Sequence, residues 1–329
     1  MDDHAADGGY RRPPVERNER GDIRSVGFEI EFSGIKVDEA AEVLRDTMGG
    51  KITTRNAAEV SIEVDQLGTF SVELDWTFLK EKAAEQGADR EDWIEWMRDA
   101  AAIVVPVEVV CPPVGIDQMA VLDPLVAGLR QAGAVGTEDS LLAAYGVHIN
   151  PEIPEMNPGT LFGYLRAFAL LQWWLADNIK VDTSRELSPF IALYGEDFVK
   201  AVASMKQPSH QEILDLYLEH NATRNRALDL LPILASLDEE RIRSELKGAK
   251  VSTRPTFHYR LADCHIQSAD WSLADAWNPW CIIEECAARP RQLEALAAEF
   301  LEADRRVLGV NRKRWVERTG QWLRSQQLG

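Results

Sequence analysis

Alternating apolar and polar residues predict β-strands in the first half of the chain. From Val26 to Phe32 every second residue is large and apolar, and the residues between are glycine and glutamate, so this strand has one apolar and one acidic face. A turn at Gln66–Thr69 contains a glycine and separates two alternating runs, which predicts a hairpin. The predicted strands are Ile23–Ile35, the segments Val60–Asp65 and Phe70–Trp76 within Lys51–Trp76, Ile103–Val110 and Ala144–Pro151.

The rest of the chain has mainly helical periodicity, with one interruption. Thr253–Leu261 alternates again and is expected to return to the sheet. Helices are predicted at Phe78–Ala102, Leu122–Ala132, Gly159–Asn178, Ser188–Met205, His210–Ala222, Arg226–Ser236 and Pro290–Leu328. Strands at 22–152 and 251–262, with helices at 158–248 and 270–328, predict an α+β fold in a single domain spanning residues 22–329.

Composition narrows the class of protein. A hydrophobic content of 45% is sufficient for a substantial core. Residues 1–21 are charged and contain glycine and proline, so they are expected to form a mobile, disordered tail without the apolar stretch of a secretion signal. The most apolar run, Leu161–Ala176, is too short to cross a bilayer comfortably and includes Arg166, which favours a buried helix in a soluble protein.

Charge and cysteine usage argue against a nucleic-acid-binding protein and against a protein stabilised by zinc or disulfides. The formal net charge is −18, so attraction to a phosphate backbone is not expected, and we predict no nucleic-acid and no membrane partner. The four cysteines form no CxxC pair, which argues against a structural zinc site and a disulfide framework. Reduced thiols of this kind fit a cytoplasmic protein.

The polar faces of the predicted strands carry carboxylates. Successive side chains of a strand point to opposite faces, so Glu29 and Glu31 share one face, about 7 Å apart at the backbone. The same spacing places Glu73 with Asp75. Each pair can bind cations jointly.

A lone acid and a histidine extend this pattern. Glu108 is the single charge in the apolar run Val104–Val110, and a buried carboxylate is costly unless it is paired or bound to metal. His148 and Asn150 share the polar face of another strand. Oxygen ligands on several strands suit Mg²⁺ or Mn²⁺, whereas zinc would require more histidine and cysteine. We therefore predict a divalent cation site; the alternative is the solvated face of a half-covered antiparallel sheet.

Cationic residues come later in the chain. Arg254, His258 and Arg260 are predicted to share one face of the late strand, and Arg224 and Arg226 are predicted at the start of a helix. Arginine suits a transferring phosphoryl group because its planar fork offers paired donors. Ordinary ion pairs are the alternative for these arginines.

No common nucleotide or nucleophile motif occurs. The chain lacks GxxxxGK[ST], GxGxxG and GxSxG, so nucleotide binding would require the metal and the sheet. His210 and His220 lie in predicted helices and are expected to be structural, and the role of His265 stays open.

Four short segments, in order, resemble the amidoligase family. They are Gly27–Phe32 (GFEIEF), Val72–Asp75 (VELD), Val107–Pro113 (VEVVCPP) and Gly146–Asn150 (GVHIN). The likeness extends from about Ser25 to Leu261, and the family is grouped with glutamine synthetase-like and glutamate–cysteine ligase-like enzymes. The resemblance implies a curved antiparallel sheet of the glutamine synthetase-like kind, with helices packed behind it and magnesium–ATP on its concave face.

The resemblance also implies roles for individual residues. It makes Glu29 and Glu31 metal ligands, Glu73 and Glu108 further ligands of metal or of a substrate ammonium, and His148 a contact of metal or phosphate. An arginine of the late strand would stabilise phosphate. The site predicted in this way has Glu29, Glu31 and Glu108 as metal ligands, His148, Asn150, Arg224 and His258 as cofactor-binding residues, and Glu73, Arg254 and Arg260 as catalytic residues.

The predicted activity is ATP-dependent ligation of a carboxylate to an amine. ATP phosphorylates the carboxylate, and the amine, deprotonated by Glu73 or by phosphate, then displaces phosphate from the acyl phosphate. The predicted cofactors are ATP and Mg²⁺ or Mn²⁺, and the partners are small-molecule or peptide acids and amines. Two alternatives stay open: a metal-dependent hydrolase using the same acids, and a binding protein that retains the fold without catalysis.

Overall fold

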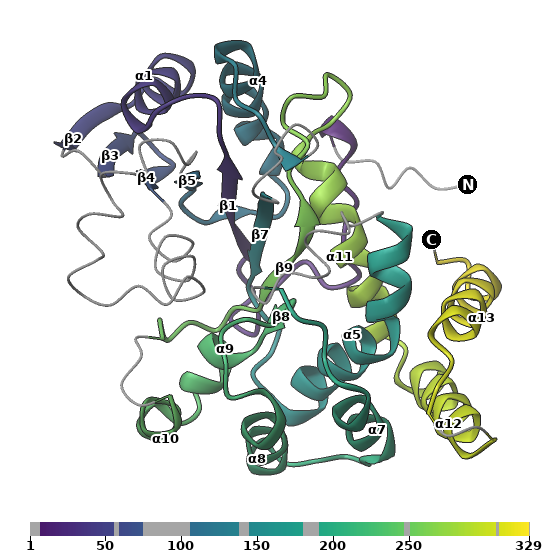
Figure 1. Ribbon diagram of the computed structural model, residues 1–329. Helices are drawn as coiled ribbons and strands as arrows, with labels where there is room; N and C mark the ends of the chain where they lie inside the picture. The colour runs from purple at the N-terminus through teal and green to yellow at the C-terminus, as the bar shows by residue number, and fades with distance from the viewer. Residues whose placement is uncertain are drawn as a thin grey trace, which may run out of the picture.

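An antiparallel sheet of nine strands forms the centre of the molecule (Figure 1). The computed structural model describes residues 7–55, 59–74, 106–137, 145–179, 191–246, 251–306 and 309–328. The strand order is β2-β3-β4-β5-β1-β7-β9-β8, with β6 also paired to β1. The strands are β1 (Ser25–Phe32), β2 (Lys51–Arg55), β3 (Glu59–Val64), β4 (Gly68–Leu74), β5 (Val107–Val110), β6 (Val114–Gly115), β7 (Gly146–Pro151), β8 (Leu228–Asp229) and β9 (His258–Asp263).

Helices make up most of the remaining described chain, so the expected mixture of helices and an antiparallel sheet is confirmed. Figure 1 shows α12 and α13 together on one side of the molecule, away from β2 and β3. The helices are α1 (Val37–Met48), α4 (Asp123–Ala132), α5 (Pro158–Asn178), α7 (Glu196–Ser204), α8 (His210–Asn221), α9 (Leu231–Ala235), α10 (Glu239–Glu245), α11 (Leu273–Ala287), α12 (Pro290–Arg306) and α13 (Arg312–Ser325), with short 3₁₀ turns η1 (Asp7–Gly9) and η3 (Met119–Leu122).

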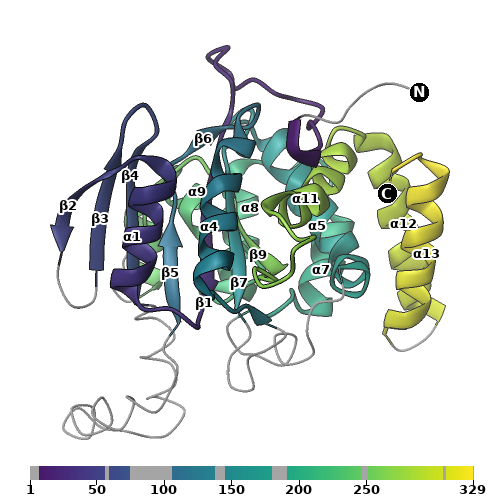
Figure 2. The same ribbon diagram turned by 90° about the horizontal axis from the view of Figure 1, so that it is seen from above.

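The two faces of the sheet differ as the alternation predicts. On β1 the side chains of Val26, Phe28, Ile30 and Phe32 are completely buried. α1 packs against β3 and β4, and α11 packs against β7 and β9. Figure 2 shows α1 and α4 in front of the strands. Each large apolar side chain buried here contributes roughly 1.5–3 kcal/mol to folding. This burial fixes which face of β1 packs against the core, so the glutamates of β1 lie on the other face of the sheet.

Several predicted elements are confirmed with small shifts of their ends. β3 and β4 form the expected hairpin, whose turn includes Gln66 and Gly68 with φ values of 67° and 111°. Gly133, at φ 100°, ends α4 in the left-handed conformation that a residue without a Cβ adopts readily. The long apolar helix forms as α5, and no described helix is long and apolar enough to cross a membrane.

The predicted helix Arg226–Ser236 is wrong at its start. Leu228 and Asp229 pair with Tyr259 and His258 of β9 and form β8, and only the five-residue α9 follows. The apolar run has helical periodicity, but in the folded chain its first residues pair with the edge of β9. The predicted helix Pro290–Leu328 is also divided, because Asn311 begins a new helix by accepting a hydrogen bond from the Arg314 amide.

The expected mobile tail is incorrect for residues 7–21. Tyr10 is buried, and its hydroxyl donates to Asp123 at 2.7 Å. The Arg11 guanidinium donates to Glu285 at 2.9 Å. The composition of this segment predicted that it would be solvated. In the structure, however, Tyr10 and Arg11 form hydrogen bonds with residues of α4 and α11.

A buried ion pair attaches the residue that precedes β1 to α11. Both nitrogens of the Arg24 fork donate to the Glu284 carboxylate at 2.7 Å, and both side chains are 0% exposed. Tyr164 and Trp280 donate to the same carboxylate at 3.0 and 2.6 Å. The pair is thus fully hydrogen-bonded, which is the condition for tolerating buried charge.

Some predictions lie outside the described residues. They include residues 1–6 of the tail, the helix Phe78–Ala102 and Asp75. They also include the ends of several predicted elements: Trp76, Ile103–Val105, Ala144 and Ser188–Phe190. All four cysteines are described, and they are buried and free of disulfides.

Candidate functional site

A row of carboxylates crosses four neighbouring strands on the acidic face. Glu59 of β3 is the register partner of Glu73 of β4, Glu73 is the partner of Glu108 of β5, and Glu108 is the partner of Glu31 of β1. We call these four residues the carboxylate row. Like charges directly opposite on adjacent strands are destabilising, so the row is suited to cations. Glu59 was not predicted, because it lies just before the alternating run.

One end of the row forms a compact ligand group with His148. Donor atoms of Glu31, Glu108 and His148 all lie within 4.8 Å of one another. Glu31 Oε1 is 3.2 Å from His148 Nε2, and its Oε2 accepts the Gly146 amide at 2.7 Å. Two carboxylates and one imidazole on three strands offer a divalent cation oxygen and nitrogen ligands.

Glu29 orients this imidazole from the opposite side. Its Oε2 lies 2.9 Å from His148 Nδ1, and its Oε1 accepts a hydrogen bond from the side-chain Nδ2 of Asn150 at 2.9 Å. Burial raises the pKa of Glu29, but hydrogen bonding and charge from His258 and His148 outweigh burial and hold the pKa well below its usual range. A carboxylate that fixes one imidazole nitrogen and leaves the other for metal is a recurring outer-shell arrangement.

Glu29 also belongs to a second possible ligand group, with His148 and His258. His258 Nε2 is 3.5 Å from Glu29 Oε2. Burial and the neighbouring Arg260 lower the pKa of His258 to about 3, so this ring is neutral at pH 7. The two groups share His148, whose two nitrogens face different carboxylates.

Sequence reasoning missed Asp229, which lies beside this cluster. It is the register partner of His258 and is 0% exposed. Its Oδ2 lies 4.0 Å from His258 Nδ1 and 3.6 Å from Arg224 Nε. The sequence does contain a feature that could have identified Asp229. It is the single charge in the apolar run Leu228–Leu234, just as Glu108 is the single charge in its own strand.

The predicted cations separate into two sets. Arg260 Nη2 is 3.4 Å from His258 Nδ1, and Arg224 reaches Asp229, so both arginines join the cluster. Arg226 instead donates to the backbone oxygens of Leu193 and His220, which gives it a structural role.

Arg254 is not brought to the cluster. The late strand begins at His258, and Arg254 precedes it with an exposed side chain that donates to Ser252 Oγ at 2.9 Å. The prediction that Arg254 shares a strand face with His258 and Arg260 is therefore wrong, because Thr253–Leu261 is only partly a strand.

The acidic face thus has two chemically different parts. The carboxylate row covers β3, β4, β5 and β1, while His258, Arg260 and Arg224 gather at β9 and β8. His148 and Glu29 lie between them. A divalent cation and an anionic group can therefore bind next to each other.

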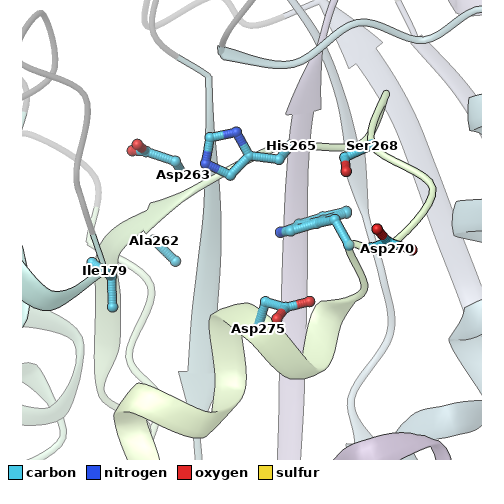
Figure 3. A pocket seen from close by; sticks show the side chains of 8 residues that line it. Ile179, Ala262, Asp263, His265, Ser268, Asp270 and Asp275 are labelled. Atoms are coloured by element: carbon cyan, nitrogen blue, oxygen red, sulfur yellow. The ribbon is translucent and has the colours of Figure 1, made fainter.

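A separate cavity of about 380 Å³ lies where β9 ends. Figure 3 shows Asp263 and His265 on one side of it and Asp275 of α11 on another. Asp275 accepts the Ser272 amide and so caps α11. His265, which the sequence left undecided, is a cavity residue, and none of the predicted site residues lines this cavity.

Fold and site together define an α+β protein with an antiparallel sheet and a carboxylate–imidazole cluster on its acidic face. The family model described as "putative amidoligase enzyme" matches residues 22–282. The chain belongs to this family of amide-bond-forming ligases. No curated protein and no solved structure matches significantly. The matched segment includes β1, every residue of the carboxylate row and the cationic cluster.

Proposed function

We propose that this protein is an ATP-dependent carboxylate–amine ligase that works on the acidic face of its sheet. The observation that carries the proposal is the register of Glu31 and Glu108 beside His148, next to a cluster of two arginines. Family membership supports an amide-bond ligase. The antiparallel sheet supports the further proposal that the fold is of the glutamine synthetase-like kind.

The residues present fit Mg²⁺ or Mn²⁺. Glu31, Glu108 and His148 would hold one ion, and Glu29 would orient His148 or, with His258, contribute to a second site. Hard oxygen ligands predominate in the group of Glu31, Glu108 and His148, which favours these ions over zinc at that position. When bound, the ions would neutralise the charge of the nucleotide phosphates and of the transferring group.

Arg260, Arg224 and His258 would act on the phosphate side. Two guanidinium groups at the β8–β9 end offer charge and paired donors to phosphoryl oxygens. Asn150 would keep Glu29 in place through its amide hydrogen bond. Arg254 has no part in this proposal.

Ligation would proceed in two balanced steps. A substrate carboxylate oxygen attacks the γ-phosphorus of ATP, the bond to the bridging oxygen breaks, and ADP leaves as an acyl phosphate forms. The amine nitrogen then attacks the acyl carbon, phosphate leaves, and Glu73 or phosphate accepts the amine proton. Glu73 lies beside Glu108 in the row, a position suited to an ammonium group before it loses its proton.

ADP release with pooled acids and amines tests the proposal. Purified protein is incubated with Mg²⁺, ATP and mixtures of amino acids or short peptides, and each component is omitted in turn. ADP release that needs both an acid and an amine is expected. Metal-dependent ester cleavage without ATP would instead identify a hydrolase. No activity in either assay, together with no binding of ATP, would refute the proposal.

A further inference from the structure

Asp229 is a fully buried carboxylate in the middle of the cationic cluster. It lies on β8, and its Oδ1 accepts the Leu231 amide at 2.9 Å. Its Oδ2 accepts no hydrogen bond from any residue in the described part of the chain. This oxygen instead faces Arg224 Nε at 3.6 Å and His258 Nδ1 at 4.0 Å. A buried carboxylate oxygen without a hydrogen bond is costly, so its charge must be balanced by these neighbours.

A rigid polar frame holds the backbone of Asp229. Tyr194 donates to the Leu228 carbonyl at 2.6 Å, and the Tyr217 hydroxyl accepts the Leu230 amide at 3.1 Å. The Arg260 amide donates to the Ala227 carbonyl at 2.8 Å. The carboxylate is therefore fixed relative to β9, whose side chains reach Glu29.

The charges explain what a carboxylate does at this position. Burial raises the pKa of Asp229, and the neighbouring Arg260, the Leu231 amide and Arg224 oppose that rise. Arg224 lies beside Asp229, and Arg260 lies beside His258, the register partner of Asp229, so a carboxylate at this position reduces the repulsion between two nearby cations. Asp229 places one carboxylate beside two arginines, so the cluster keeps an excess of cationic groups that can bind an anion.

We propose that Asp229 is a positioning residue that holds Arg260 and Arg224 at the β8–β9 end of the acidic face, where they bind the phosphates of ATP. The inference rests on the proposed function, because it concerns how that site retains its phosphate-binding arginines. Asp229 contacts neither phosphate nor metal itself. It acts through the arginines.

Binding of ATP in the presence of Mn²⁺, measured by calorimetry, tests the proposal without knowledge of the acid or the amine. The variants are Asp229→Asn, Arg260→Ala and the double variant. Asparagine keeps the shape and the acceptor for the Leu231 amide but removes the charge. We expect each single variant to weaken ATP binding by about tenfold or more. The double variant should bind no more than about twofold weaker than the weaker single variant, since both changes disable the same group.

Two controls separate positioning from a general loss of structure. Mn²⁺ binding without nucleotide should be unchanged in Asp229→Asn, because Glu31, Glu108 and His148 lie on other strands. Asp123→Asn removes a half-buried charge from α4, beneath Tyr10, and should leave ATP binding unchanged. Arg224→Gln removes the second cation while leaving the Asp229 carboxylate and its bond to the Leu231 amide in place, so it is informative even if Asp229→Asn does not fold. A loss of about tenfold is expected for it as well.

The outcomes distinguish this inference from the proposed function. If the unaltered protein binds no ATP with Mn²⁺, the proposed function fails, and this inference fails with it. If the unaltered protein binds ATP but Asp229→Asn or Arg224→Gln binds equally well, only this inference is overturned. Losses that multiply in the double variant, or a parallel loss of Mn²⁺ binding, would also overturn it by showing a general structural effect.

Discussion

Glu31 of β1 and Glu108 of β5 are register partners on adjacent antiparallel strands, and His148 reaches the same point from β7. Two like charges in this relationship destabilise the sheet unless something positive lies between them. His148 is one neighbour that can lie beside both carboxylates, and a divalent cation held by all three side chains would be another.

Glu31→Gln and Glu108→Gln should each reduce ADP formation by at least roughly 100-fold, because each removes a direct metal ligand. Stability without metal should be equal or slightly higher, since the substitution relieves repulsion worth up to about 1 kcal/mol. Steady-state ADP release and urea unfolding check the two effects. Glu63→Gln, at an exposed position of β3 outside the row, is the matched control. Full turnover in either variant would remove that residue from the site.

Glu29→Gln should have a milder effect than Glu31→Gln on Mn²⁺ affinity. If Glu29 orients His148 from the outer shell, its amide variant weakens Mn²⁺ binding by about 10–100-fold without abolishing it. Direct titration with Mn²⁺, followed by electron paramagnetic resonance, measures the difference. Complete loss of binding would instead place the ion in the group formed by Glu29, His148 and His258.

Arg24→Met should destabilise the protein by about 3–5 kcal/mol, because it leaves the Glu284 carboxylate buried without its cation. Urea unfolding measures the loss, and Arg24→Met combined with Glu284→Gln should recover part of it. The exposed pair Arg318 and Glu299 provides the contrast: Arg318→Met should cost at most about 1 kcal/mol. Equal losses in the two variants would contradict the assignment of a buried ion pair.

The thiols should react slowly in the folded protein at mildly alkaline pH. Burial raises the pKa of Cys286 to about 12 from 9.0, and burial also raises the pKa values of Cys111 and Cys281. A raised pKa means less thiolate: at pH 8, Cys286 has roughly a thousandfold less than an ordinary cysteine. Reaction with a chromogenic disulfide reagent, with and without urea, checks this expectation. Rapid labelling of all four thiols at pH 8 without denaturant would refute it.

The sequence by itself determined the strands that carry the row, because the two-residue period of a strand is a local property. Once the apolar face of β1 is buried, Glu29 and Glu31 must lie on the opposite face of the sheet, and the same argument applies to Glu73, Glu108 and His148. Turn and cap glycines are local in the same way, so the hairpin at Gly68 and the end of α4 at Gly133 were also predictable.

Only the tertiary structure decided which charges meet. Leu228–Asp229 was predicted as helix because its periodicity contains no information about the free edge of β9. Arg24 and Glu284 are 260 residues apart in the chain, and the pairing of Tyr10 with Asp123 is equally non-local. Arg254 lies outside the cluster because β9 begins four residues after it, at His258. Local patterns fix the face of an element, whereas partners across the fold depend on burial and strand pairing that no short segment specifies.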